Sequence, residues 1–104
     1  MTEQPGHPNI LPRQFEWDPA KSAQNEAKHG LPLDLAVLLF DGPTLERDDT
    51  RRDYGERRIL ATGTVSGEVL MCVYTDREPG IRRIISLRFA NRRERRDYRA
   101  THPG

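Results

Sequence analysis

The stretch from residue 57 to residue 90 most constrains the fold, because it reads as consecutive strands separated by turn residues. The segments RRILATGTV and EVLMCVYTDR lie on either side of Ser66 and Gly67. Apolar and β-branched runs separated by two such residues predict a two-residue β-hairpin. Residues 78–80, with the sequence EPG, supply the next turn and lead into a further strand.

That further strand, IRRIISLRFA, has a regular alternation of side chains. Because successive side chains of a strand point to opposite faces, the pattern predicts one core face and one largely polar face. The predicted core face carries Ile85, Leu87 and Phe89. The predicted polar face carries Arg82, Ile84, Ser86 and Arg88.

Two helices are predicted before the strands. Asp18 is a suitable N-cap, Pro19 fits the first helical position, and Gly30 can end the helix. A second short helix is expected from about residue 33 to residue 40, since its apolar residues form one stripe. These residues are Leu35, Ala36, Leu39 and Phe40.

A basic helix is predicted at the C-terminal end. Asn91 followed by Glu94 resembles a capping box, and RRERRDYRA continues the helix with five arginines. The whole pattern predicts an α+β fold: two N-terminal helices, a mostly antiparallel curved sheet of about four strands, and the basic C-terminal helix. We expect a flexible leader over residues 1–14, a single domain over residues 15–100 and a frayed tail over residues 101–104.

Composition excludes several classes of protein. The longest apolar runs have five or six residues, far below the roughly 20 that cross a bilayer, and no secretory signal is present, so we expect a cytoplasmic protein without a membrane partner. Cys72 is the single cysteine and lies in an apolar string, which favours a buried, inert thiol. No zinc-ligand spacing or nucleotide-binding loop occurs, so we expect neither a metal nor a cofactor.

Charge is distributed unevenly along the chain. Residues 1–50 hold four basic and nine acidic side chains, a net charge of −5, whereas residues 51–104 hold thirteen arginines and seven acids, a net charge of +6. A basic half of this kind favours an anionic polymer as a partner. The excess of arginine over lysine, fifteen to two, is also explained by a GC-rich genome and carries less weight.

Cations and one imidazole remain as candidates for chemistry. Cleavage of RNA needs a base for the 2′-hydroxyl, cations for the phosphate and an acid for the leaving 5′-oxygen, and in principle no metal. Histidine is the side chain that most often transfers protons near neutral pH, which makes His29 the candidate, and Arg58, Arg83 and Arg88 could face a phosphate. The alternatives are a helix-capping role for His29 and surface arginines paired with the acids Glu56, Glu68 and Asp76.

The chain resembles the BrnT family of toxin–antitoxin ribonucleases, which have a RelE-like fold. Four strings carry the resemblance, in this order along residues 15–98: FEWDPAKSAQNEAKHG, LDLAVLLFD, DYGERRILATG and VYTDREPGIRRIISLRFANRRERRDY. The resemblance implies a toxin that cleaves RNA and is neutralised by BrnA, a ribbon-helix-helix antitoxin. It implies contact with operator DNA only indirectly, through that antitoxin.

The matched motifs suggest the site residues. His29, Glu56, Arg58, Arg83 and Arg88 are the predicted catalytic residues, and Lys28, Ser86 and Arg82 are predicted to bind substrate. In this hypothesis His29 exchanges a proton, the arginines bind the scissile phosphate, and Glu56 is either the complementary base or the partner that orients an arginine. The basic C-terminal helix is expected to attract RNA, and acidic residues of the antitoxin are expected to cover the same surface.

Two points stay open at this stage. Strict alternation separates Arg83 from Ser86 and Arg88, so one site can use all three only if a bulge or a strand end intervenes, and Arg82 is the geometric substitute. The second point is the function, since a non-catalytic module that binds RNA or antitoxin would keep the same fold. Tyr54 could also stack on a base.

Overall fold

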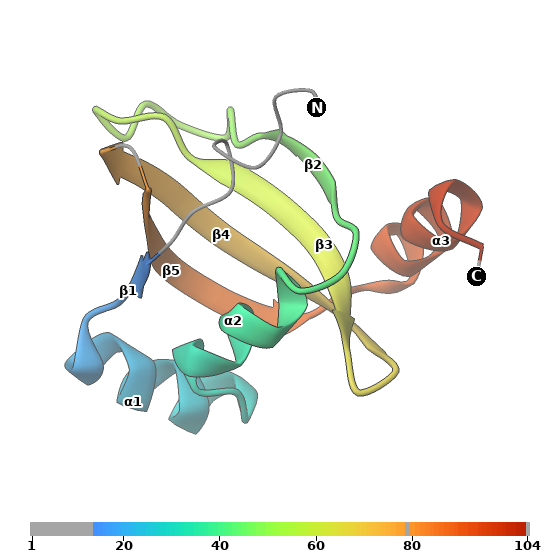
Figure 1. Cartoon of the computed structure of the whole chain (residues 1–104), viewed down its shortest axis with the longest axis horizontal. Helices are drawn as coiled ribbons and strands as arrows, with labels where there is room; N and C mark the ends of the chain where they lie inside the picture. The colour runs from blue at the N-terminus through green and yellow to red at the C-terminus, as the bar shows by residue number, and fades with distance from the viewer. Residues whose placement is uncertain (1–13, 79, 104) are drawn as a thin grey trace, which may run out of the picture.

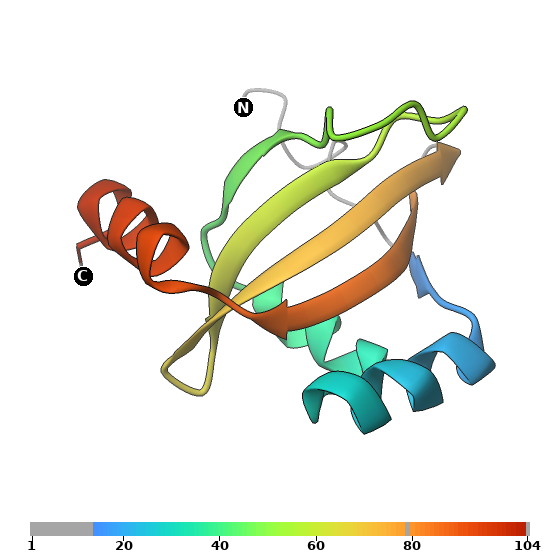
Figure 2. The same ribbon diagram turned by 180° about the vertical axis from the view of Figure 1, so that it is seen from behind.

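Three long antiparallel strands form the centre of the molecule, and short helices pack against one face of them (Figure 1). The structure is a computed structural model that describes residues 14–78 and 80–103. Its elements are β1 (Gln14–Glu16), α1 (Pro19–His29), the 3₁₀ turn η2 (Leu33–Leu35), α2 (Ala36–Leu39), β2 (Leu45–Asp48), β3 (Ile59–Val65), β4 (Glu68–Glu78), β5 (Ile81–Phe89) and α3 (Arg92–Thr101). The strand order in the twisted sheet is β1-β5-β4-β3-β2 (Figure 2).

The helices begin where the sequence predicts. The side chain of Asp18 accepts a hydrogen bond from the backbone N–H of Ala20 at 2.9 Å, and Gly30 is the C-cap of α1. The predicted second helix is divided into η2 and α2, and the capping box of Asn91 and Glu94 opens α3. Among the described residues, no helix is long and apolar enough to cross a membrane.

The hairpin between β3 and β4 is also confirmed. Val65 pairs with Glu68, which leaves Ser66 and Gly67 as the two turn residues. Both have positive φ angles, 51° and 83°, as a type I′ turn requires. The twist of a type I′ turn matches the right-handed twist of the flanking strands, so the register of β3 against β4 follows from this dipeptide.

The sheet has five strands instead of about four, and it is mixed: three of its four strand pairings are antiparallel, as predicted, and one is parallel. The additional strand is β1, which pairs in parallel with the start of β5 through Gln14 opposite Ile81 and Glu16 opposite Arg83. Three residues are too few to show an alternating pattern, so local sequence did not predict this strand. Gln14, which we assigned to the leader, is its first residue, and residues 1–13 of the predicted leader lie outside the described part of the chain.

The core lies between the sheet and the helices that follow β1. Its largest fully buried side chains come from η2, α2 and the strands β4 and β5, and they are Leu33, Leu39, Leu70, Cys72, Ile84 and Leu87. Burial raises the pKa of the Cys72 thiol well above its ordinary value, because the thiolate would lose its hydration. The prediction of a buried, inert thiol is therefore confirmed.

A bulge at Ile85 changes the predicted faces of β5. Ser86 pairs with Val73 and Ile84 pairs with Tyr74, so no residue of β4 stands opposite Ile85. An extra residue in one strand shifts the alternation by one position. The prediction that Ile84 faces away from the core is therefore wrong, and Ile85 packs in a separate cluster on the other side of the sheet.

The bulge also determines which face of the sheet each polar residue of β5 occupies. The helix face, which carries the core, also holds Arg82, because its partner Asp76 shares a face with Tyr74. The opposite face, here called the distal face, carries Arg83, Ser86 and Arg88, whose partners in β4 are Thr75, Val73 and Met71. Strict alternation had divided these three residues between two faces, and the bulge brings them to one.

The side chain of Asn25 completes the edge of β5 where β1 has ended. Its amide nitrogen donates to the backbone carbonyls of Leu87 and Leu31, both at 2.7 Å, and its amide oxygen accepts from the N–H of Leu87 at 3.3 Å. Asn25 is buried. The Asn25 amide therefore makes the two backbone hydrogen bonds of Leu87 that a neighbouring strand would make, and it joins α1 to the sheet.

We expect Asn25→Ala to lower the free energy of unfolding by about 3 kcal/mol, because it leaves buried backbone groups of Leu87 and Leu31 without partners. Urea denaturation followed by circular dichroism measures this change. The matched control is Gln24→Ala, at the exposed neighbouring position, which should change the stability by less than about 0.5 kcal/mol. Equal stabilities of the two variants would contradict the bridging role of Asn25.

A buried carboxylate organises the long loop between β2 and β3. The side chain of Asp49 has no exposed surface and accepts hydrogen bonds from the Arg51 guanidinium, two at 2.8 Å, and from the Tyr54 hydroxyl at 3.0 Å. These hydrogen bonds hold the pKa of the Asp49 carboxyl well below its ordinary value, and the bond from the Arg51 side chain has the largest effect. The backbone N–H of Asp49 also donates to the carbonyl of Arg58 at 2.8 Å, which ties the two ends of the loop together.

The lowered pKa of Asp49 predicts a loss of stability in acid. Its folded-state pKa lies below the unfolded one, so its contribution is present above the unfolded pKa and is lost as the pH falls from about 5 to 2. Asp49→Asn should cost about 2 kcal/mol at pH 7 and should flatten the dependence of unfolding free energy on pH. The exposed Asp41→Asn is the control, and a parent-like slope in Asp49→Asn would count against this assignment.

Candidate active site

A cationic groove opens on the distal face, between the start of α1, β5, the end of β4 and the loop before β3. Its volume is about 440 Å³. It is lined by Asp18, Lys21, Glu56, Arg58, Arg77, Arg83, Ile84 and Ile85. Four of these eight residues are cations from four different parts of the chain. The groove therefore has the charge to attract a phosphodiester group.

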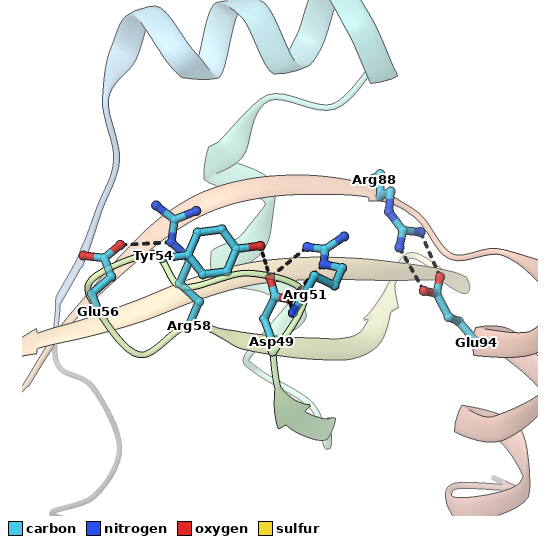
Figure 3. Close-up of polar contacts among 7 residues, drawn as sticks. All are labelled: Asp49, Arg51, Tyr54, Glu56, Arg58, Arg88 and Glu94. Carbon is cyan, nitrogen blue, oxygen red and sulfur yellow. Dashed lines mark hydrogen bonds and ion pairs between the residues drawn. The ribbon is translucent and has the colours of Figure 1, made fainter.

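Arg58 is held at the floor of this groove by two neighbours (Figure 3). It precedes β3, where the Thr75 hydroxyl donates to the carbonyl of Arg57 at 2.7 Å and fixes the strand end. Its Nε donates to Glu56 Oε2 at 3.0 Å, and its guanidinium carbon lies 4.2 Å from the centre of the Tyr54 ring. Among the described residues, the two Nη groups have no hydrogen-bond partner, so this edge of the fork is free for a ligand.

Arg83 faces the same groove from β5 and shares a carboxylate with Arg77. Glu16 Oε2 accepts from Arg77 Nη1 at 2.8 Å and from Arg83 Nη1 at 3.1 Å. The hydrogen bond from Arg77, followed by that from Arg83, lowers the pKa of Glu16. Strand β1, which carries Glu16, thus positions two cations, and the short parallel pairing has a direct effect on the site.

Lys28 and His29 lie at the other end of α1 from the groove. Lys21, in the first turn, lines the groove, and eight residues of helix separate it from His29, about 12 Å along the axis. Lys28 is exposed and His29 is half-buried. No hydrogen bond within the described residues connects either side chain to Glu56, Arg58 or Arg83. The structure therefore does not place the predicted proton-transfer residue in the groove that Arg58 and Arg83 line.

Arg88 shares the distal face with Arg83 but lies at the other end of β5. Five residues of strand separate them, about 16 Å. Arg88 forms a two-bonded ion pair with Glu94, with both N···O distances 2.8 Å (Figure 3). The hydrogen bond from Arg88 is the main cause that lowers the pKa of Glu94. Since Glu94 also closes the capping box of α3, Arg88 joins β5 to the start of that helix.

Ser86 and Arg82 complete the set of predicted residues. Ser86 lies on the distal face between Arg83 and Arg88, and it is partly exposed. Arg82 lies on the helix face, where its guanidinium is 3.9 Å from the centre of the Tyr74 ring and pairs with Asp76 at 2.9 Å. Arg82 therefore does not line the groove. The sequence predicted Arg82 as a substitute in case Arg83 faced the wrong way, but Arg83 itself lines the groove.

Several residues of the groove were not predicted as site residues from the sequence. Lys21 belongs to the first matched string and has the right residue type, but nothing local shows that α1 begins beside the end of β4. Arg77 follows the apolar part of β4 in a strand that continues to Glu78. Glu16 required the parallel pairing of β1 to be known. The charge of these residues is visible in the sequence. What the sequence does not show is which segments of the chain lie next to each other.

A second hollow lies on the distal face beside α3, with a volume of about 380 Å³. Thr62 and Met71 form its floor, and Arg47, Asn91 and Arg93 are among its walls. Arg88 and Arg51 lie close enough to influence each other electrostatically. The cationic groove and this hollow therefore open on the same side of the sheet.

Comparisons with known proteins agree with the fold. The crystal structure of the Brucella abortus ribonuclease toxin BrnT, solved at 1.1 Å resolution, matches with a TM-score of 0.57 at 23% sequence identity, over 76% of this chain and 97% of that chain. No curated protein matches the chain. The family model described as "Ribonuclease toxin, BrnT, of type II toxin-antitoxin system" matches residues 17–94, a range that includes Lys21, Arg58 and Arg83. The resemblance seen in the sequence is confirmed: the chain belongs to the BrnT family of ribonuclease toxins of type II toxin–antitoxin systems.

Proposed function

We propose that this protein is a metal-independent endoribonuclease whose active site is the cationic groove. The observation that carries the proposal is the arrangement of Glu56, Arg58 and Arg83 in one groove, with the Nη groups of Arg58 left without a hydrogen-bond partner among the described residues. A guanidinium fork binds a phosphate through two parallel hydrogen bonds. Lys21 and Arg77 also line the groove, and their positive charge would stabilise the negative charge that develops on the phosphorane.

The proposed reaction is attack of the 2′-oxygen on the adjacent phosphorus. The bond from the 2′-oxygen to phosphorus forms, and the bond from phosphorus to the 5′-oxygen breaks, which leaves a 2′,3′-cyclic phosphate and a 5′-hydroxyl. The geometry favours Glu56 as the acceptor of the 2′-hydroxyl proton, since it lies beside Arg58 in the groove, whereas His29 lies at the far end of α1. His29 stays our proposed donor of the proton to the leaving 5′-oxygen, a role to be tested separately.

The RNA strand is proposed to cross the distal face from the cationic groove to the hollow beside α3. Both concavities open on that face, where Arg88 lies at the α3 end and Arg51 lies between Tyr54 and Arg88 (Figure 3). In this arrangement Arg88 and Ser86 contact flanking nucleotides, and Arg58 and Arg83 contact the scissile phosphate. Arg88 must exchange part of its bond with Glu94 for a phosphate contact.

The proposed antitoxin is BrnA-like, with a ribbon-helix-helix domain that contacts operator DNA, so that this chain reaches the operator only through it. Helix α3 is the proposed surface for the acidic residues of that partner. Arg92, Arg96 and Arg99 are exposed and lie three or four residues apart, so they form one basic stripe along the helix. Buried Tyr98, whose hydroxyl donates to the carbonyl of Pro43 at 2.8 Å, holds the opposite side of α3 to the domain.

A non-catalytic binding module is the second candidate. The ion pairs of Arg58 with Glu56 and of Arg83 with Glu16 favour it, because paired surface arginines need no catalytic role. The two candidates differ in one measurable property, which is whether the isolated chain cuts RNA.

End-labelled RNA incubated with the antitoxin-free chain in EDTA should be cut, and Arg58→Ala should lower the cleavage rate about 100-fold or more. Glu56→Gln should lower it as well, since it removes the proposed base and the negative charge that strengthens the bond to Arg58. Arg57→Ala is the matched control, because Arg57 is the neighbouring arginine and its exposed side chain pairs with Asp48 outside the groove. Arg57→Ala should cut at the parental rate.

The same assay separates the remaining possibilities. Loss of cutting in His29→Ala, with the fold intact, would support its role as proton donor, and full retention would assign that proton to another group. A folded parent that cuts none of several RNAs would exclude the proposed cleavage by the isolated chain and leave the binding module.

Neutralising α3 tests its part in RNA binding. We expect Arg92→Gln, Arg96→Gln and Arg99→Gln together to weaken RNA binding and to reduce the slope of log affinity against log salt by up to about 3. Fluorescence anisotropy at several salt concentrations measures the slope, with labelled RNA as the probe. The proposed basic surface is ruled out if affinity for both RNA and antitoxin is unchanged in this variant.

A further inference from the structure

Tyr54 contacts the Arg58 side chain and has no role in the proposed chemistry. The ring faces the guanidinium at 4.2 Å, within the range of a cation–π interaction. At its other end, the Tyr54 hydroxyl donates to Asp49 Oδ2 at 3.0 Å (Figure 3). The tyrosine therefore connects the groove arginine to the buried carboxylate at the root of the loop.

Asp49 is a rigid anchor for this contact. Its side chain is fully buried and is held by the guanidinium and the backbone N–H of Arg51. The backbone N–H of Asp49 donates to the carbonyl of Arg58. One residue thus fixes the main chain of Arg58 through its backbone and the ring beside the Arg58 side chain through its carboxylate.

A sharp turn brings Tyr54 back over Arg58. Gly55, between them in the chain, has a φ angle of 74°, a left-handed conformation that glycine adopts without strain. Asp53 Oδ1 accepts from the N–H of Gly55 at 2.9 Å and stabilises the turn. The sequence DYGERR therefore places an aromatic ring on the face of its own last arginine.

We infer that Tyr54 is a positioning residue, which holds the plane of the Arg58 guanidinium so that its Nη edge faces the scissile phosphate. The face of the guanidinium is covered by the ring and its Nε edge is bound by Glu56, so only the Nη edge is left for the substrate. The Arg58 side chain has 26% of its surface exposed, which is enough for that edge to meet a ligand. This inference rests on the proposed function and adds how the groove orients its central cation.

Purely structural support of the loop is the competing explanation, and a double-mutant cycle separates the two. Tyr54→Leu should lower kcat about tenfold in the parent with a smaller change in KM, because the phosphate is bound in a less favourable orientation. In an Arg58→Ala background the same substitution should have no further effect on kcat. Tyr54→Phe, which keeps the ring and removes only the hydroxyl, should restore most of the parental kcat.

A readout that does not require cleavage completes the test. Nuclear magnetic relaxation of the Arg58 Nε–H group should show an ordered side chain in the parent and in Tyr54→Phe, and a loss of order in Tyr54→Leu. An equally ordered Arg58 in Tyr54→Leu overturns the inference, as does an equal loss of kcat in both backgrounds of the cycle. If the folded parent does not cut RNA while the relaxation data show the expected loss of order, the proposed catalysis fails and the positioning contact stands.

Discussion

The bulge at Ile85 is the constraint on which the distal face depends. One unpaired residue in β5 places Arg83, Ser86 and Arg88 on the same side of the sheet, while Ile84 and Leu87 both reach the core. Without it, each residue before Ile85 would change faces relative to those after it. Such a slip would expose a buried isoleucine and turn Arg83 inward, and both changes are unfavourable. Burial of Ile84 and Leu87 therefore determines the position of the bulge. The bulge in turn determines that Arg83, Ser86 and Arg88 lie on the same face.

The uneven charge of the chain is explained in part by ion pairs between its two halves. The acidic N-terminal half supplies Glu16 to Arg77 and Arg83, Asp48 to Arg57 and Asp49 to Arg51. These partners orient the arginines without neutralising the groove, since more cations than carboxylates line it. The asymmetry that suggested an anionic polymer thus reflects both internal pairing and a surplus of cations, which is concentrated in the groove and on α3.

Local physics accounts for what could be predicted. Asp18 and Asn91 cap helices through bonds to residues two or three positions away, and Ser66 with Gly67 sets a hairpin by its own backbone angles. Such features need only neighbours in the chain. The site was predicted in part for the same reason, since Glu56 and Arg58 are two residues apart and meet locally, whereas Glu16 and Arg83 are joined across 67 positions.

The sequence by itself determined the helices and their caps, the hairpin and the residue types of the site, through interactions that act within a few residues. The tertiary structure alone decided that β1 adds to β5, that Asn25 completes the edge of β5, and that Lys21, Arg58 and Arg83 face one groove while His29 does not. The physical reason is that strand pairing and burial of β5 act between distant segments. Their register depends on the balance of packing and hydrogen bonding over the whole sheet, which no short window of sequence contains.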